Sequence, residues 1–169
     1  MLRAQCHDRE ALESLLRGVM PVLRRYLQGL VGTFEADDVL QDVLVLACRN
    51  LSCLQMPELF RPWIYRTASR AAFRRLKQQT SRLEHALDES VLEQLPAPDT
   101  HPPVEFFDGL MGTSSIPAAS RAVLALHFRE ELSLAEVAAI LEIPLGTVKS
   151  RLAYGLTALR KQLNQTRSI

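Results

Sequence analysis

The sequence predicts an all-α protein in which an acidic linker joins two small helical domains. Apolar residues recur at helical spacing along most of the 169 residues, whereas the alternation typical of strands is nearly absent. Residues 81–112 contain four prolines and seven carboxylates. So long a segment with little helical pattern is unusual inside one compact domain. We therefore expect a first domain at residues 1–80, a linker at 81–112 and a second domain at 113–169.

The first domain begins with two predicted helices. Asp8 is a suitable N-cap residue, and three leucines follow it on one helical face. Pro21 favours the first turn of a second helix, because the N–H group that proline lacks is unpaired at this position anyway. Gly32 is expected to end the second helix, since glycine is common just after a helix C-terminus.

Two further helices are expected in the first domain. The first runs from about residue 35 to 51, and three carboxylates in its first turn interact favourably with the helix dipole. Prolines occur within and directly after residues 52–61, so a break is expected there. The last helix of the domain should run from Pro62 to about Gln79.

The second domain contains a predicted helix-turn-helix. A helix start is expected at residues 115–117, and Ser133 with Glu136 matches a capping box, in which each side chain accepts from the other's backbone N–H. A turn at residues 142–144 should separate the capped helix from the final helix. The apolar residues of the final helix form one seam: Val148, Leu152, Leu156, Leu159 and Leu163.

Charge is strongly segregated although the net charge is only +1. Residues 1–80 carry a net charge of +4, residues 81–112 of −6 and residues 113–169 of +3. The sequence is therefore two basic modules on either side of an acidic segment. No apolar run is long enough to span a membrane, and the N-terminus does not resemble a secretory signal, so we expect a cytoplasmic protein without membrane insertion.

The sequence offers little support for catalysis, metals or cofactors. Cys48 and Cys53 could bind a metal together with a histidine, but their spacing favours free thiols, and we expect no metal and no cofactor. The four histidines are scattered, and the common phosphate-binding, zinc-protease and serine-hydrolase motifs are absent from the sequence. We therefore expect a protein that is not an enzyme.

The final helix is the first candidate DNA-binding element. From Gly146 to the C-terminus there are five basic residues and no acid, which an ordinary solvated helical hairpin would not require. Basic and hydroxyl side chains near a helix N-terminus suit phosphates and base edges. The candidate contact residues are Thr147, Lys149, Ser150, Arg151 and Tyr154.

A row of basic residues follows Pro62, and no acid occurs between residues 59 and 83. Like charges four residues apart repel, so such a row indicates an anionic partner. Phe60, Trp63 and Tyr65 near its start could stack on unpaired bases, although filling the core is the more ordinary role of Trp63 and Tyr65. The row consists of Arg66, Arg70, Arg74, Arg75 and Lys77.

An acidic group precedes this basic row. Asp37 and Asp38 are explained by the dipole of the helix at residues 35–51 alone, but Gln41 and Asp42 extend the group along the helix. The alternative interpretation is a docking face for a basic protein surface.

Three segments together resemble the extracytoplasmic-function (ECF) group of bacterial RNA polymerase sigma factors. Residues 36–42 (ADDVLQD) resemble the polymerase-docking motif of sigma region 2, and residues 60–68 (FRPWIYRTA) resemble the start of its helix that reads the promoter −10 element. Residues 143–152 (IPLGTVKSRL) are close to the signature of region 4, which reads the −35 element. The resemblance covers nearly the whole chain, with the linker matched by position and character.

The resemblance implies a region 2 helical bundle and a region 4 helix-turn-helix that together direct core polymerase to promoters. The first domain would dock on the clamp of the largest subunit, the linker would thread towards the active-site cleft, and the second domain would bind the flap and the −35 duplex. Members of the family often work with an anti-sigma protein, which the resemblance adds as a candidate partner. The resemblance assigns polymerase binding to Asp37, Asp38, Leu40, Gln41 and Asp42. It assigns −10 binding to Asn50, Phe60, Arg66, Arg70, Arg74, Arg75 and Lys77, with the loop of residues 50–61 holding a flipped base.

The sequence departs from the family at several positions. Arg70 and Arg74 stand where the family has Asn and Asp, and Glu142 replaces a glycine at a cost of about 1 kcal/mol if its backbone is left-handed. Residues 153–156, with Gly155 among them, lack the family's further arginines, which predicts weaker −35 binding. Two alternatives remain: a dimeric helix-turn-helix regulator, and a sigma-like decoy that binds polymerase without initiating.

Overall fold

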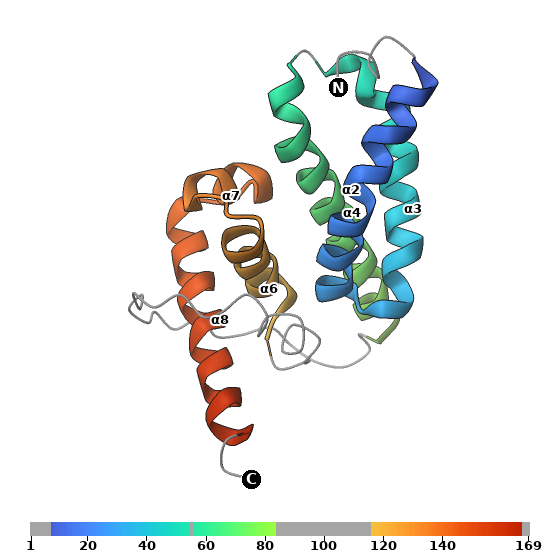
Figure 1. The fold of residues 1–169 in the computed structure, drawn as a ribbon. Helices are drawn as coiled ribbons and strands as arrows, with labels where there is room; N and C mark the ends of the chain where they lie inside the picture. The colour runs from blue at the N-terminus through green and yellow to red at the C-terminus, as the bar shows by residue number, and fades with distance from the viewer. Residues whose placement is uncertain (1–7, 55, 84–115, 167–169) are drawn as a thin grey trace. The chain divides into compact units, whose positions relative to one another are not determined.

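The computed structural model describes residues 8–54, 56–83 and 116–166, and those residues contain helices and turns but no strand. The chain divides into two compact units between Leu83 and Glu84 (Figure 1). The all-α prediction is thus confirmed for the part of the chain that is described. We call the described residues before this point unit 1 and those after it unit 2.

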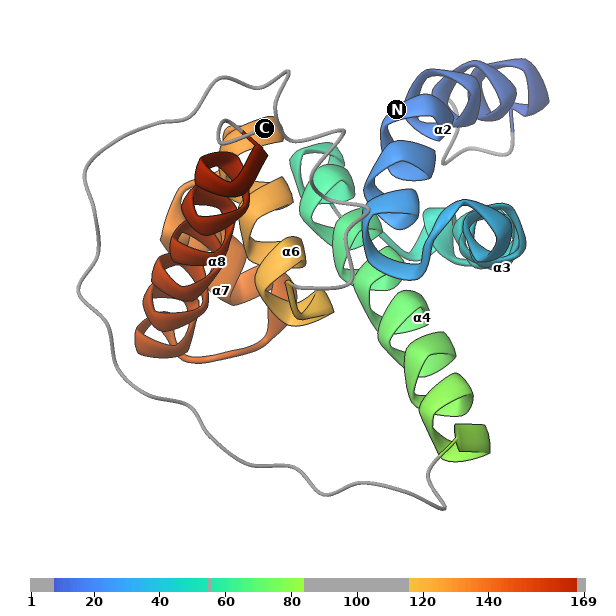
Figure 2. The same cartoon turned by 90° about the horizontal axis from the view of Figure 1, so that it is seen from below.

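Unit 1 is a bundle of three long helices with two short 3-10 turns. Helix α2 packs against both α3 and α4, and α3 also packs against α4 (Figures 1 and 2). The elements are α2 (Arg9–Val31), α3 (Thr33–Asn50), η1 (Leu51–Cys53), η2 (Pro57–Leu59) and α4 (Phe60–Leu83).

The core of unit 1 joins the three helices through apolar side chains and one buried polar contact. Leu23, Val43 and Ile64, from α2, α3 and α4 in turn, are fully buried. The Tyr26 hydroxyl lies 2.7 Å from Ser69 Oγ, which itself donates to the Tyr65 carbonyl at 2.7 Å. Since the serine proton is committed to that carbonyl, Tyr26 is the donor in its bond to Ser69. The bond satisfies two hydroxyls inside the bundle and fixes α4 against α2.

The prediction of two separate helices before Gly32 is wrong, because residues 9–31 form a single helix with Pro21 inside it. Proline removes one backbone hydrogen bond, but burial of Leu23 and Leu27 directly after it favours continuation of the helix. The expected ends are confirmed: Asp8 accepts from the Ala11 N–H at 3.1 Å, and Gly32 follows the helix with φ 85°.

Helix α4 is longer than predicted at both ends. It begins at Phe60 rather than Pro62, and this costs no hydrogen bond because the first four N–H groups of a helix have no partner within it. It continues past Gln79 to Leu83, since neither glycine nor proline interrupts these residues. The expected break is present as the two 3-10 turns that separate α3 from α4.

Unit 2 consists of shorter helices packed on one long helix. Helices α6 and α7 both contact α8 (Figure 2). A π-helical segment directly follows α6, a feature that the sequence pattern did not indicate. The elements are α6 (Ala118–Leu124), the π segment η3 (Ala125–Arg129), α7 (Leu134–Leu141) and α8 (Leu145–Thr166).

The helix-turn-helix has the local chemistry that the sequence predicted. Ser133 Oγ accepts from the Glu136 N–H at 3.3 Å, and the Ser133 N–H donates to Glu136 Oε2 at 2.8 Å, which confirms the capping box. Glu142, at the end of α7, has a left-handed backbone conformation with φ 56° and ψ 43°. The glycine that the family has at this position had implied such a conformation. The seam of α8 is buried at Val148, Leu152, Leu156 and Leu159.

Candidate functional site

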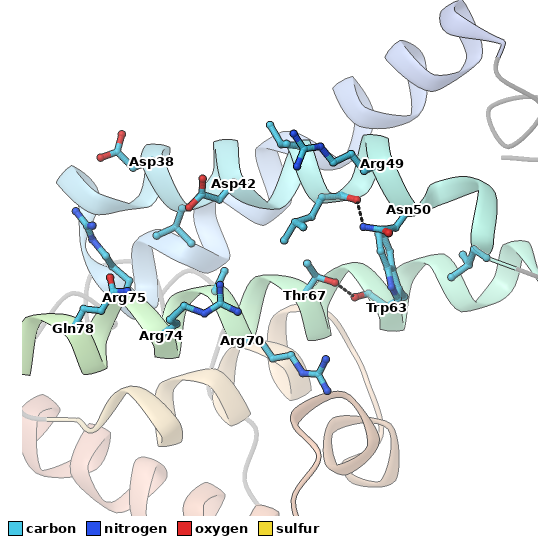
Figure 3. Close-up of a pocket in the computed structure, with 15 residues that line it drawn as sticks. Asp38, Asp42, Arg49, Asn50, Trp63, Thr67, Arg70, Arg74, Arg75 and Gln78 are labelled. Atoms are coloured by element: carbon cyan, nitrogen blue, oxygen red, sulfur yellow. Dashed lines mark hydrogen bonds between the residues drawn. The ribbon is translucent and has the colours of Figure 1, made fainter.

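A groove of about 870 Å³ runs along unit 1 between α3 and α4 (Figure 3). One wall is a single face of α3, and the other is a single face of α4, which runs in the opposite direction. The α3 wall consists of Asp38, Val39, Asp42, Val45, Leu46, Arg49 and Asn50. Leu54 and the α4 residues Trp63, Thr67, Arg70, Ala71, Arg74, Arg75 and Gln78 complete the lining.

The two walls carry opposite charge at one end of the groove. Arg75 of α4 forms an ion pair with Glu35 of α3, and both side chains are partly buried. The hydrogen bond to Glu35 raises the pKa of Arg75 above its ordinary value, and the charge of Glu35, with smaller contributions from Asp38 and Asp42, raises it further. Arg75 therefore lies in an acidic environment made by the first turns of α3.

A second ion pair joins α3 to α2. Arg24 donates from Nε and Nη2 to the two carboxylate oxygens of Asp37, each at 2.7 Å. This hydrogen bonding, followed by the carboxylate charge, raises the pKa of Arg24. About half of each side chain is exposed, so solvent weakens the pair. The Asp37 carboxylate is nevertheless engaged within unit 1.

The residues predicted to bind polymerase do not all lie on the surface. Asp38, Gln41 and Asp42 are exposed on α3. Leu40 is only 6% exposed and belongs to the core of the bundle, so its side chain is not available for docking. The motif mixes core and surface residues because one helical turn contributes to both faces.

The predicted −10 residues fall into three groups. Arg70, Arg74 and Lys77 are exposed, and Arg66 is half-buried. Asn50 is exposed at the end of α3, where its amide donates to the Leu46 carbonyl at 2.9 Å. Two residues have a structural role: Phe60 is 8% exposed and Arg75 is held by Glu35.

The structure also places the apolar residues Trp63, Val45 and Leu46 in the groove, and of these the sequence analysis had singled out only Trp63. Trp63 is half-buried in the wall near Asn50 (Figure 3), whereas Tyr65 is buried in the core. Val45 and Leu46 are 42% and 38% exposed on the α3 wall. Val45 and Leu46 follow Asp42 by three and four residues, and residues at this spacing share a helical face. This spacing was the sequence signal that could have placed them on the same wall as the aspartates.

In unit 2 the predicted DNA-binding residues gather in the first three turns of α8. Lys149 and Tyr154 are exposed, and Arg151 is half-buried. Ser150 Oγ donates to the Thr147 carbonyl at 3.0 Å, which leaves its lone pairs to accept from a partner. Among the described residues, neither Lys149 nor Arg151 has an ion-pair partner.

Comparison with known proteins agrees with this geometry. The family model "Sigma-70 region 2" matches residues 12–82, and "Sigma-70, region 4" matches residues 114–161. The "ECF RNA polymerase sigma factor SigW" of Bacillus subtilis (strain 168) is 30% identical over 143 residues, which cover 76% of this chain and 75% of the relative. The chain belongs to the ECF sigma factors. Accordingly, it is a transcription initiation factor that directs polymerase to promoters.

Other relatives of this ECF sigma factor are more distant. The "ECF RNA polymerase sigma-E factor" of Escherichia coli (strain K12) is 25% identical over 162 residues, covering 89% of this chain and 85% of the relative. The sigma factor RpoE, solved in complex with the anti-sigma factor NepR from Bartonella quintana, has the same fold, with a TM-score of 0.69 at 22% identity over 92% of this chain and 98% of that one. CnrH, solved with the cytosolic domain of CnrY, gives a TM-score of 0.62 at 18% identity over 97% and 94% of the two chains.

Neither a membrane-spanning helix nor a metal site is found in the described part of the sigma factor. None of its helices combines the length and the hydropathy that crossing a bilayer requires. Within the same residues, no group of three or more His, Cys, Asp and Glu side chains is arranged to hold a metal ion. Cys48 is a free, exposed thiol.

Proposed function

We propose that the two units divide promoter recognition, with unit 1 binding polymerase and the −10 strand and unit 2 binding the −35 duplex. The observation that carries this proposal is the presence of one exposed basic helical face in each unit. In unit 1 the face lies on α4 and includes Arg70, Arg74 and Lys77. In unit 2 it lies at the start of α8 and includes the exposed Lys149 and the half-buried Arg151. Phosphate binding by such faces releases counterions and dominates affinity for nucleic acid.

The groove of unit 1 suits an unpaired strand. Trp63 offers a partly exposed ring on which a base can stack, and the Asn50 amide at the same end can donate and accept at a base edge. Arg70 and Arg74 follow along α4 at positions where they can bind phosphates. Phe60 supports this site from the core, and Arg75 supports it through its ion pair with Glu35. We do not assign a direct contact with DNA to either residue.

The exposed face of α3 is the proposed docking surface for the polymerase clamp. Asp38, Gln41 and Asp42 supply charge and hydrogen bonds, and Val45 and Leu46 supply apolar area. A mixed surface of this kind is typical of a specific interface, where charge steers the encounter and apolar contacts slow dissociation. Leu40 contributes indirectly by holding α3 in the bundle, and Asp37 by its pair with Arg24.

Helix α8 is the proposed reading helix for the −35 element. Its N-terminal residues carry the helix-turn-helix contacts, as in other proteins of this architecture. Lys149 and Arg151 bind backbone phosphates, while Thr147, Ser150 and Tyr154 are placed to contact base edges or phosphates. The proposed domain limits are residues 1–80, 81–112 and 113–169. Residues 81–83 of the linker belong to α4, and its residues 84–112 lie outside the described part of the chain.

Regulation by an anti-sigma protein is a further part of the proposal. Two solved proteins of the same fold, RpoE and CnrH, were each captured with a partner, an anti-sigma factor in the first case. We propose that this chain is held in a similar way before it meets polymerase, and that it acts in the cytoplasm, where polymerase is found.

Transcription in vitro tests the proposal. Purified core polymerase and DNA fragments from upstream of the chain's own gene should give specific transcripts only when the protein is added. Binding to core polymerase without a transcript would indicate a decoy, and tight operator binding by a free dimer would indicate a helix-turn-helix regulator. Replacing Asp38 and Gln41 together by alanine should weaken core binding while circular dichroism stays unchanged. Unchanged affinity of that variant would place the docking surface elsewhere.

A further inference from the structure

Phe34 differs from every other apolar residue on the surface of the described chain, because its ring is almost wholly in water. It lies in the first turn of α3 and is 99% exposed, whereas the other exposed large apolar residues are 38–54% exposed. Single half-exposed apolar residues are normal on a protein surface, but a fully exposed phenylalanine forgoes the whole free energy of burial. Phe34 therefore contributes almost nothing by packing to the stability of unit 1.

The bundle cannot cover Phe34, because the residue lies on the side of α3 that points away from the core. An α-helix turns about 100° per residue, so Phe34 and the fully buried Val43 project in opposite directions. The other buried residues of α3 cluster around Val43: Ala36, Val39, Leu40 and Ala47. The exposure of Phe34 thus follows from its position in the helix, and not from a local failure of packing.

Phe34 is the first of four exposed residues on one side of α3, which we call the α3 ridge. The four residues follow one another at spacings of four, three and four positions, so they lie within an arc of about 60° around the helix axis. They are Phe34, Asp38, Gln41 and Val45. Each end of the ridge is apolar and its middle is polar. The helical rise per residue separates Phe34 from Val45 by about 16 Å.

We propose that Phe34 is an apolar anchor for the polymerase clamp, with its ring inserted into an apolar pocket beside the basic groups that meet Asp38. The occupant is polymerase because Phe34 lies one helical turn before Asp38, with β-carbons about 5–6 Å apart, and a surface that covers Asp38 also reaches the ring. The inference rests on the proposed docking role of α3 and adds a residue outside the motif of residues 36–42. It requires two apolar sites on the clamp, about 16 Å apart, on either side of a basic centre.

Phe34 and the acidic residue of the ridge act on different steps of docking. Charged groups steer the encounter, so Asp38 acts mainly on the association rate and on its salt dependence. Aromatic residues that fill a desolvated pocket carry much of the energy of an interface, and their loss is felt mainly in the dissociation rate. Phe34 therefore lengthens the lifetime of the complex without changing how the association rate depends on salt.

Biolayer interferometry with immobilised core polymerase and the full chain tests the anchor. Phe34→Ala should raise the dissociation rate about 10- to 100-fold and change the association rate less than about twofold. Phe34→Leu, which keeps an apolar side chain, should recover most of this loss. The matched control is Leu59→Ala, because Leu59 is 44% exposed in η2 and lies outside the ridge. An unchanged dissociation rate for Phe34→Ala, or equal effects of Phe34→Ala and Leu59→Ala, would overturn the proposal.

Two further measurements keep this result unambiguous. Phe34→Ala removes almost no packing, so the Tm of unit 1, followed by the fluorescence of Trp63, the single tryptophan, should stay unchanged. Sedimentation velocity tests the other possible occupant, a second copy of the chain. A dimer that Phe34→Ala dissociates, together with unchanged affinity for core polymerase, would assign the ring to self-association and overturn the proposal.

The double variant D38A/Q41A separates the anchor from the proposed docking surface. Loss of core affinity in D38A/Q41A but not in Phe34→Ala would overturn the anchor and leave the proposed docking surface in place. Loss in Phe34→Ala but not in D38A/Q41A would support the anchor and contradict the docking role of Asp38 and Gln41.

Discussion

Gly155 of α8 lies so close to Leu124 of α6 that a β-carbon added to the glycine would come within 2.7 Å of the leucine Cδ1 atom. The same β-carbon would meet Leu124 Cγ at 3.1 Å and Ser120 Cβ at 3.5 Å. Leu124 is fully buried, and because protein interiors are closely packed, moving its side chain aside should have a cost. The departure from the family at Gly155 is therefore part of how α6 and α8 pack in this chain.

Replacing Gly155 by alanine should destabilise unit 2. Overpacking typically costs 1–3 kcal/mol, and the better helix propensity of alanine returns up to about 1 kcal/mol, so we expect a net loss of about 1 kcal/mol. Gly146→Ala in the same helix is the matched control, because a β-carbon at that position would have no neighbouring atom within 4 Å. Thermal unfolding followed by circular dichroism should show a lower Tm for the first variant only. Equal Tm values would mean that Leu124 yields without cost.

Glu142 provides a second test of local backbone strain. It occupies the left-handed region with φ 56°, and the Ile143 N–H that follows it donates to the Ala138 carbonyl at 3.2 Å. Glycine adopts this conformation without steric cost, so Glu142→Gly should raise the stability of unit 2 by about 0.5–1 kcal/mol.

Glu142→Ala is the control for that substitution, because it removes the same side chain but keeps the β-carbon. The alanine variant should be no more stable than the unchanged protein, since φ remains positive. Circular dichroism melts of the three proteins give the comparison. Equal stabilisation by glycine and alanine would assign the effect to the carboxylate and not to the backbone.

Much of this fold was predictable because its local rules agree with one another. The capping box at Ser133, the helix stop at Gly32 and the seam of α8 depend on residues a few positions apart, and each was found as expected. The prediction at Pro21 was wrong. The preference of proline for the first turn of a helix indicated that a new helix begins there, but tertiary packing favours continuation of α2 through this residue. The π segment after α6 was not predicted, because the spacing of apolar residues in one sequence does not distinguish a short π segment from an α-helix.

The candidate site was predicted less completely than the fold. Motifs identified α3, α4 and α8 as the functional helices, but they could not separate core from surface within a helix. Leu40 and Phe60 lie within functional motifs and are buried. For Trp63 the sequence left open base stacking and the more ordinary core role, and the structure places it in the groove. The ion pair of Arg75 with Glu35 joins residues 40 positions apart, which no local pattern reveals.

Arg74 and Arg75 are neighbours with different expected roles. Arg74 is exposed and has no ion-pair partner among the described residues, whereas Arg75 is paired with Glu35. Arg74→Ala should reduce the slope of log affinity against log salt for single-stranded DNA by about 0.7, because one phosphate contact is lost. Arg75→Ala should leave that slope nearly unchanged and should lower the Tm of unit 1 by a few degrees, measured by Trp63 fluorescence. The reverse pattern would assign the phosphate contact to Arg75.

Substitution of Arg151 tests whether α8 binds the −35 duplex as proposed. It lies within the first two turns of the helix and has no ion-pair partner among the described residues, so its charge is available to a phosphate. Arg151→Ala should lower transcription from a −35-dependent promoter and should reduce the salt slope for duplex binding by about one. Lys161→Ala removes an equal charge ten residues further along the same helix and should change neither quantity. An unchanged slope in the Arg151 variant, with the fold intact, would show that the duplex is held by another face of unit 2.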